Sequence, residues 1–204
     1  MQGHNVESPR HWDELFCRPG HRKSPLYEAR AWNATTVITI KDNDSVFYEK
    51  LQGTWKMTAY EVDTENGGYL ASETWTVKVI GFDEGEEGYD KVLYITGMLG
   101  YEWTMLQVNY HFDMETKKGY LEVPYGTVFA EKVNFSGLGE CDVIAGGLTE
   151  DGYIDLESSF KGEWNDEFNL ITFDENAQLW GFIPHAASGK TYLWFAYGKF
   201  TMTR

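Results

Sequence analysis

One stretch decides the fold class, namely Leu106-Gln107-Val108-Asn109-Tyr110-His111-Phe112-Asp113. Apolar and polar side chains alternate along it, which is typical of a strand with one buried and one solvated face. The same alternation runs through Trp75-Thr76-Val77-Lys78-Val79. Residues 154–160 repeat it, with Ile154, Leu156 and Phe160 as the apolar members. These stretches predict strands of an antiparallel sheet.

Turn-forming residues separate the alternating stretches at short and fairly even spacing. They are Asn66-Gly67-Gly68, Gly85 to Gly88, Lys118-Gly119, Gly146-Gly147, Asp151-Gly152 and Ser188-Gly189. About ten strands fit between these turns, and no sustained segment carries an apolar stripe at helical spacing. The last strand is apolar on both faces over Tyr192 to Tyr197, so we expect it to be central or to close the sheet. We predict an all-β fold, an antiparallel barrel of about 8 to 10 strands, with a β-sandwich or jelly roll as the alternative.

The composition of the chain changes near residue 50. Residues 1–50 hold seven basic and seven acidic side chains, so residues 51–204 hold 10 basic and 25 acidic ones and the entire net charge of −15. Residues 1–30 lack periodicity, whereas Thr35 to Ile40 is β-branched and precedes a polar cluster. We expect a poorly structured leader over residues 1–50 with one strand near 35–41, followed by an antiparallel β-barrel domain over 51–204.

The acidic balance limits the possible partners. With a pI near 4.6, the protein is a poor match for nucleic acids and for anionic membrane surfaces. No window approaches the run of about 18 apolar residues that a spanning helix needs, so we expect no membrane-spanning segment. Residues 1–30 also lack an apolar stretch of signal-peptide length. The protein is therefore expected to be cytoplasmic or to have lost an export signal.

The stretch Leu51-Gln52-Gly53-Thr54-Trp55-Lys56-Met57 resembles the opening of the calycin superfamily, which includes lipocalins and fatty-acid-binding proteins. There, a Gly-x-Trp sequence begins the first strand: the glycine allows a close turn, and the indole points inward to plug one end of the barrel. A basic residue on the last strand lies over that indole. The resemblance implies a barrel closed by Gly53, Trp55 and Arg204, with Lys199 as a second candidate for the cation.

A second and shorter resemblance lies just before the barrel. Residues 36–44, from Thr36 to Asp44, resemble the closing strand and acidic tail of a Calx-β domain. Such a strand ahead of an acidic, aromatic-rich β domain is similar to surface or periplasmic lipoproteins of gut Bacteroidetes. The resemblance implies a secreted protein or lipoprotein in the periplasm or at the cell surface.

Aromatic residues are the most informative feature for function. Residues 51–204 hold six Trp, eleven Tyr and ten Phe, more than a core of this size calls for. Tyr101 and Trp103, and also Trp180 and Phe182, lie next to expected strand ends. Flat rings beside carboxylates and amides suit sugars and small amphipathic ligands. We predict that these four residues bind a ligand at the open end of the barrel, although packing in the core is the alternative for any single ring.

Residues with catalytic or metal-binding chemistry are present without a recognisable pattern. Glu163 with Asp166 or Glu167 could cleave a glycosidic bond, but Asn165-Asp166 is typical of a turn. Five carboxylates between Asp83 and Asp90 do not follow a calcium-loop spacing and fit a solvated hairpin tip. No nucleophile elbow, phosphate loop or dinucleotide fingerprint occurs, so we expect no metal and no cofactor.

Three functions remain as hypotheses. The first is a non-enzymatic binding module that takes a small amphipathic or glycan-derived ligand at the open end of a β-barrel. The alternatives are a structural or adhesion domain of a cell surface without a cavity, and a glycoside-acting enzyme. Cys17 and Cys141 are too few for a disulfide scaffold, and a single bridge between them is open, as is the oligomeric state.

Overall fold

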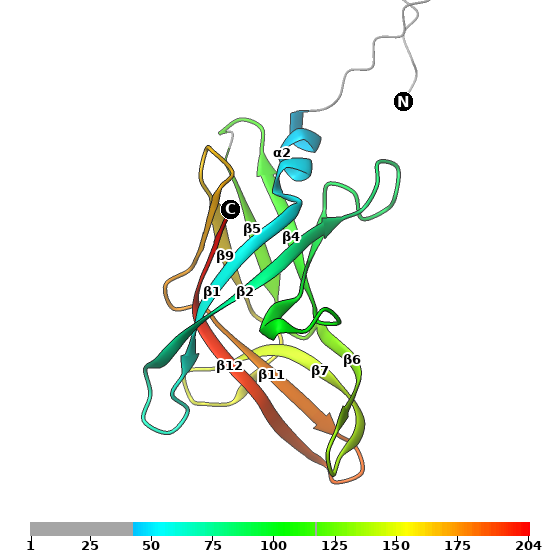
Figure 1. The fold of residues 1–204 in the computed structure, drawn as a ribbon, viewed down its shortest axis with the longest axis vertical. Coiled ribbons are helices and arrows are strands. Elements are labelled where there is room, and N and C mark those ends of the chain that lie inside the picture. The colour runs from blue at the N-terminus through cyan, green and yellow to red at the C-terminus, as the bar shows by residue number, and fades with distance from the viewer. Residues whose placement is uncertain (1–42, 117) are drawn as a thin grey trace, which may run out of the picture. The chain divides into compact units, whose positions relative to one another are not determined.

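A computed structural model describes residues 43–116 and 118–204 (Figure 1). These residues hold one α-helix, one short 3₁₀ helix and twelve strands. In chain order they are α2 (Asn43–Leu51), β1 (Gly53–Val62), β2 (Tyr69–Gly81), β3 (Val92–Thr96), η1 (Met98–Gly100), β4 (Met105–Asp113), β5 (Lys118–Pro124), β6 (Val128–Phe135), β7 (Gly139–Leu148), β8 (Ile154–Asp155), β9 (Ser159–Trp164), β10 (Leu170–Phe173), β11 (Gln178–His185) and β12 (Lys190–Thr203).

Eight of the strands form a closed antiparallel barrel. Their hydrogen-bonded order is β1-β2-β3-β4-β5-β9-β10-β12, and β12 pairs back to β1. Closure removes the free edges that an open sheet would expose to other chains. The prediction of an all-β antiparallel barrel is confirmed, and a sandwich of two separate sheets is excluded.

Strand β12 belongs to the barrel and to an extension of it. Its last residues pair with β1 and β10, whereas its first half pairs with β11. From β11 the sheet continues through β7 to β6, and β8 pairs with β7 (Figure 1). The prediction that this strand is central or closes the barrel is confirmed. Covering on both faces explains the apolar character at Phe195 and Ala196, which are buried, whereas Tyr192 and Leu193 are 36% and 45% exposed.

The interior of the barrel is filled with side chains. Leu93, Ile95, Val108, Leu121 and Val123 point inward and are 0% exposed. Because a side chain without accessible surface cannot line a void that admits water, the middle of the barrel is packed. No ligand-sized cavity therefore lies around these residues. A ligand site has to lie elsewhere on the described part of the chain.

Gly53, Trp55 and Arg204 meet at one end of the barrel. Gly53 has a φ of 114°, which only glycine adopts easily, and Trp55 follows as a buried side chain that is 1% exposed. The guanidinium carbon of Arg204 lies 4.1 Å from the centre of the Trp55 ring. Arg204 Nη2 also donates a hydrogen bond of 2.6 Å to the carbonyl oxygen of Gln52. The end of the chain is thus fastened across the start of the first strand.

Helix α2 covers the same end of the barrel, and the sequence analysis does not predict it. Tyr48 and Leu51 are fully buried, and the Leu51 carbonyl accepts a 2.9 Å hydrogen bond from Trp55 Nε1. Tyr48 Oη donates to the carbonyl of Val92 at 2.6 Å. A nine-residue helix is too short to show a distinct apolar stripe. The strand expected near 35–41 and most of the Calx-β-like stretch lie outside the described residues.

The extension covers the opposite end of the barrel. Phe129 of β6 and Phe195 of β12 lie with their ring centres 4.9 Å apart, and they belong to the same apolar core as the barrel interior. β6 also lies against β4. The end that the sequence analysis leaves open to a ligand is therefore occupied by these rings.

One predicted strand is much shorter than expected. Ile154 and Leu156 are 44% and 43% exposed, whereas Phe160 is buried, so the alternation over residues 154–160 does not mark a single half-buried strand. The Asp155 carboxylate accepts hydrogen bonds of 3.0 Å from the backbone N–H groups of Glu157 and Ser158. This local turn ends β8 after two residues.

Candidate functional site

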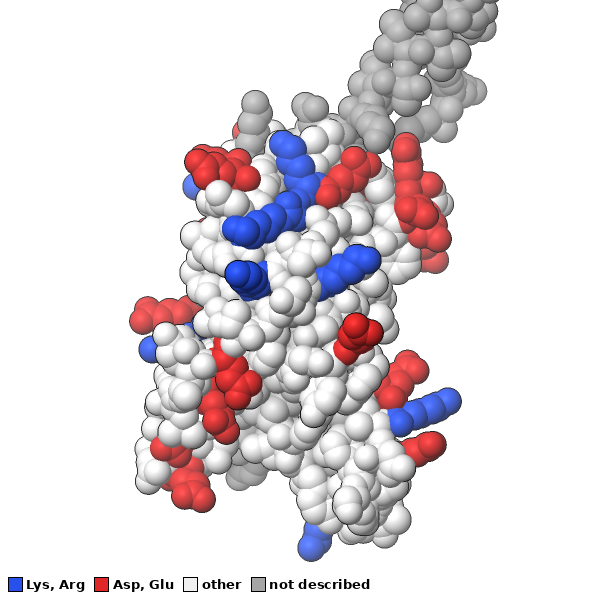
Figure 2. All heavy atoms as spheres, viewed as in Figure 1, with Lys and Arg blue, Asp and Glu red and all other residues white. Residues whose placement is uncertain are grey.

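A groove of about 680 Å³ lies on the outer surface between β3, β4 and β6, and we name it the outer groove. Tyr94, Thr96 and Gln107 line it from the outward faces of β3 and β4. Thr127 and Glu131 line it from the β6 side, and Glu102 and Trp103 from the loop before β4. Figure 2 shows one face of the molecule, on which large uncharged areas lie between scattered acidic and basic side chains. The volume is within the range of small-molecule sites.

Three aromatic rings, Tyr101, Trp103 and Trp194, form a cluster beside this groove, which we name the aromatic platform. Trp103 stacks on Tyr101 at 4.8 Å and on Trp194 at 5.7 Å between ring centres. Tyr101 and Trp194 are 6.0 Å apart, far less than the sum of the other two distances, so the rings form a triangle and not a column. Tyr101 and Trp103 remain 46% and 48% exposed. The platform thus offers a broad apolar surface to solvent.

The loop that presents Tyr101 and Trp103 is held rigidly. Gly97, Leu99 and Gly100 all have positive φ values, and Met98 anchors the loop in the core at 1% exposure. Thr104 is fully buried, and its hydroxyl donates to the Tyr101 carbonyl at 2.8 Å and lies 3.1 Å from the Met98 carbonyl. A positive φ at a residue such as Leu99 stores strain that the surrounding contacts must hold. These contacts hold the backbone of the loop that carries the two rings.

We predict that Thr104→Val lowers the free energy of unfolding by about 1 kcal/mol, because valine has the shape of threonine without the hydroxyl that holds the loop. Thr104→Ser keeps the hydroxyl but loses a buried methyl group, so it measures the packing contribution separately. Urea unfolding followed by tryptophan fluorescence compares both variants with wild type. A valine variant as stable as wild type would contradict the role given to the hydroxyl.

A β-bulge in β12 places Trp194 in the platform. Gly181 of β11 pairs with Phe195, but the next residue, Phe182, pairs with Leu193, so Trp194 is an extra residue in its strand. Trp194 and Phe195 consequently pack on the same core, whereas Ala196 points to the opposite face. Bulges of this kind redirect a side chain, and they are frequent next to functional sites.

The structure brings together two of the four predicted ligand-binding residues. Tyr101 and Trp103 meet in the platform. Trp180 and Phe182 stack on each other at 6.3 Å in a second, smaller apolar cluster, and they are only 7% and 6% exposed. We therefore leave them out of the candidate site. Trp194 belongs to the platform instead. Its neighbours in the sequence are apolar, which indicates a core position.

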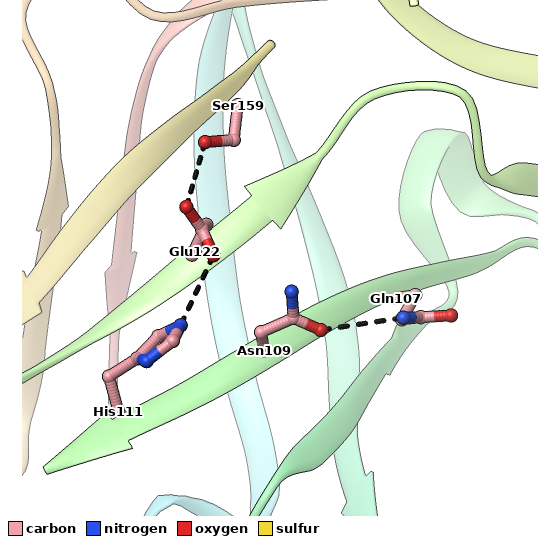
Figure 3. A network of polar contacts seen from close by, with 5 residues as sticks. All are labelled: Gln107, Asn109, His111, Glu122 and Ser159. Carbon is pink, nitrogen blue, oxygen red and sulfur yellow. Dashed lines mark hydrogen bonds and ion pairs between the residues drawn. The ribbon is translucent and has the colours of Figure 1, made fainter. Parts of the chain in front are cut away.

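A row of polar side chains continues from the groove along the outer face of the barrel (Figure 3). We name Gln107, Asn109, His111, Glu122 and Ser159 the polar strip. Gln107 Nε2 donates to Asn109 Oδ1 at 3.4 Å. The Glu122 carboxylate accepts a 2.9 Å hydrogen bond from Ser159 Oγ and lies 3.1 Å from His111 Nε2. Successive β4 members are two residues apart, so they share one face of the strand.

The polar strip contains a carboxylate whose pKa is displaced. The hydrogen bond from Ser159, with weaker ones from His111 and Asn109, lowers the pKa of Glu122, and partial burial opposes this shift. Because the folded state favours the ionised carboxylate, Glu122 stabilises the fold above the usual glutamate pKa of about 4.3. This contribution is lost as the pH falls through the lower pKa of the folded state.

We predict that Glu122→Gln lowers the unfolding temperature at pH 7 and that the difference from wild type shrinks as the pH falls below about 4. Thermal unfolding at a series of pH values measures this difference. Ser159→Ala is the companion variant, since it removes the main donor and should reproduce part of the effect. An unchanged difference between pH 7 and pH 3 would contradict the assignment.

The carboxylates proposed for glycoside cleavage lie on the surface. Glu163 and Asp166 line a depression of about 320 Å³ beside Trp164, and Asn165 begins a turn in which Phe168 N–H donates to the Asn165 carbonyl at 3.0 Å. Glu163, Asp166 and Glu167 are exposed, whereas a general acid needs a pocket that disfavours its charge. Among residues 43–116 and 118–204, no three His, Cys, Asp or Glu side chains converge to hold a metal ion.

Comparisons with known proteins found no match to this chain. No family model matches the chain, and neither the search of curated proteins nor the search of solved structures gave a match. The resemblances to Calx-β domains and to lipoproteins of Bacteroidetes therefore gain no support from them. Within the described part of the chain, no helix has the length and apolar character required to cross a membrane.

Proposed function

We propose that the protein is a non-enzymatic binding module that holds a glycan-derived ligand in the outer groove against the aromatic platform. The observation that carries the proposal is the exposure of two stacked rings, Tyr101 and Trp103, on a loop fixed by a buried threonine. Leaving such rings in water costs stability, which a folded protein gains back by covering them with a partner.

The chemistry around the rings favours a sugar over a purely apolar ligand. Thr96, Gln107 and Thr127 offer hydroxyl and amide groups along the groove walls. The charged residues of the lining are Glu102 and Glu131, which accept hydrogen bonds from hydroxyls and repel anions. Pyranose rings combine an apolar face, which stacks on indole and phenol rings, with hydroxyls that both donate and accept. A neutral glycan therefore fits this lining.

We further propose a calycin-like barrel from a surface or periplasmic lipoprotein of the Bacteroidetes type. The stacking of Arg204 on Trp55 supports the calycin part, since this pair is the arrangement that the sequence resemblance implies. The acidic charge and the aromatic content support this location only because they resemble those of such lipoproteins. Detection of a processed, lipid-modified protein in the envelope of its source would test this proposal, and recovery from the cytoplasm alone would contradict it.

Calorimetric titration with a panel of neutral oligosaccharides tests the binding function. We expect one class to bind, and Tyr101→Ala to weaken that binding about tenfold. Tyr153→Ala is the matched control, because Tyr153 is a 73% exposed tyrosine outside the groove and the platform, and it should bind as wild type does. Binding of an amphipathic compound in place of sugars would support the binding function and contradict the glycan as its ligand. Absence of any ligand, or normal binding by Tyr101→Ala, would overturn the proposal.

A further inference from the structure

We infer that two copies of this chain form a dimer through one face of the extension, the face that carries Trp180 and Phe182. We name this surface the extension face, and its exposed members are Leu148, Ile154, Leu156 and Leu193. None of these four residues lines the outer groove or belongs to the aromatic platform. The inference therefore does not depend on the proposed ligand, and it gives the chain a partner that the outer groove does not imply.

The pairing register places apolar residues side by side on this face. Phe182 of β11 pairs with Leu193 of β12 on one side and with Ile144 of β7 on the other. Because directly paired residues point to the same side of a sheet, the three side chains share one face. Leu179 and Ile183 alternate with Trp180 and Phe182 along β11 and belong to the main core. The extension face is therefore the side of the sheet that points away from that core.

The face continues over the far end of β7. Leu148 lies on the same side of β7 as Gly146, two residues earlier, and it pairs with Ile154 of β8. A Cβ atom on Gly146 would lie 2.8 Å from Leu156 Cδ2 and 2.9 Å from Phe182 Cε2. Leu156 thus packs beside Phe182 over the glycine, and the exposed members belong to one continuous surface.

Four aliphatic side chains of this face remain open to solvent. They are between 38% and 45% exposed, and they surround two aromatic rings that are nearly buried. Exposed leucines that are scattered singly are ordinary on a protein surface. A contiguous group of them on one sheet face, in contrast, is typical of an interaction surface. A partner that covers the group removes its apolar area from water.

The charge of the face favours a second copy of the chain as this partner. The outward positions of β11, and of β12 as far as Gly198, carry no charged side chain, although the whole chain has a net charge of −15. The charges at the border are engaged. The Asp142 carboxylate accepts a 2.8 Å hydrogen bond from Lys132 N–H, and Lys199 Nζ lies 4.7 Å from the Tyr69 ring centre.

Two copies that met through acidic surfaces would repel each other, whereas the extension face brings only apolar groups together. The same patch on both copies can cover itself in a two-fold arrangement. A strongly charged partner would lose hydration on this face without finding a counter-charge. A second copy is thus the occupant that fits the lack of charge.

The size of the face agrees with a dimer that depends on protein concentration. Tyr69 packs against Trp180 and its neighbours, and Tyr60 beside it is 39% exposed, so the face reaches β1. The five strands β1, β12, β11, β7 and β8 then span about 24 Å across the sheet and about 20 Å along β11. This footprint of about 500 Å² is at the lower end of what each partner contributes to a specific interface, which is about 800 Å² of accessible surface.

Sedimentation velocity at protein concentrations from about 1 to about 200 μM tests the inference. We expect the mass to rise from the 23.5 kDa of one chain toward twice that value. Leu193→Glu should weaken the dimer at least about tenfold, because a two-fold arrangement would bury two new carboxylates. Ile154→Glu is a second variant on another strand of the face, and circular dichroism shows that each variant folds.

Leu170→Glu is the matched control, because Leu170 is a 37% exposed leucine of β10 outside the extension face. It should form the dimer as wild type does. A wild-type chain that stays monomeric over the whole concentration range would overturn the inference. A dimer that persists unchanged in both Leu193→Glu and Ile154→Glu, or one that Leu170→Glu weakens equally, would place the contact elsewhere and would also overturn it.

Discussion

Trp55→Ala should lower the free energy of unfolding by about 3 to 5 kcal/mol, the largest stability effect that we expect from one substitution in this barrel. The indole is 1% exposed, donates a 2.9 Å hydrogen bond to the Leu51 carbonyl and carries the Arg204 guanidinium on its face. Its removal leaves a cavity and a buried carbonyl acceptor without its donor, and it releases the cation from its ring. Denaturant unfolding followed by circular dichroism measures the loss.

Arg204→Met separates the contribution of the cation from that of the indole. Methionine keeps an apolar chain over the ring but removes the charge and the 2.6 Å hydrogen bond to Gln52, so we expect a loss of about 1 to 2 kcal/mol. Trp55→Ala combined with Arg204→Met should then cost less than the sum of the two single changes, because the pair interacts directly. Additive losses would show that Arg204 and Trp55 stabilise the barrel independently.

The barrel was predictable because its strands carry local signals. Alternation over residues 106–113 places Leu106, Val108 and Tyr110 inward, and all three are buried. The Gly-x-Trp stretch likewise marks the start of the first strand, since Gly53 has the positive φ that its turn requires. Period-2 patterning and turn chemistry depend on neighbouring residues, so they can be read without knowing which strands pair.

The packed interior and the position of the candidate site were not predictable in the same way. Whether a barrel is hollow depends on how its inward side chains meet across the interior, and Phe129 adds to this core from a strand that belongs to the extension and not to the barrel. The partners of β12 change along its length, which no local pattern encodes. These features depend on pairings between segments that are far apart in the sequence.

The four ring residues proposed from sequence illustrate the limit most clearly. Tyr101 and Trp103 follow a glycine-rich stretch, which favours an exposed loop, and they do lie in one. Trp180 and Phe182 flank Gly181 and come shortly before Pro184, which favours a strand end, but they lie in a strand covered by other residues. Trp194 joins the platform only because the bulge shifts the register by one residue, and a run of apolar residues gives no sign of that shift.

Trp103→Ala should weaken ligand binding at least about 30-fold, which corresponds to about 2 kcal/mol, while it lowers the free energy of unfolding by only about 1 kcal/mol. Trp103 is the member of the platform that stacks on both other rings and also lines the outer groove. Its loss removes the stacking surface proposed for the ligand and one of the ring contacts of Trp194.

Trp103→Phe distinguishes the stacking surface from the size of the indole. Phenylalanine retains a flat apolar face at the same position, so we expect it to recover part of the binding that alanine loses. Titration of both variants with the ligand of the wild type provides the comparison, and their unfolding curves show that each one folds. If Trp103→Ala binds as tightly as wild type, the exposed rings serve another purpose. If Trp103→Phe binds the ligand no more tightly than Trp103→Ala, a specific contact of the indole carries the affinity. The flat surface of the platform then does not.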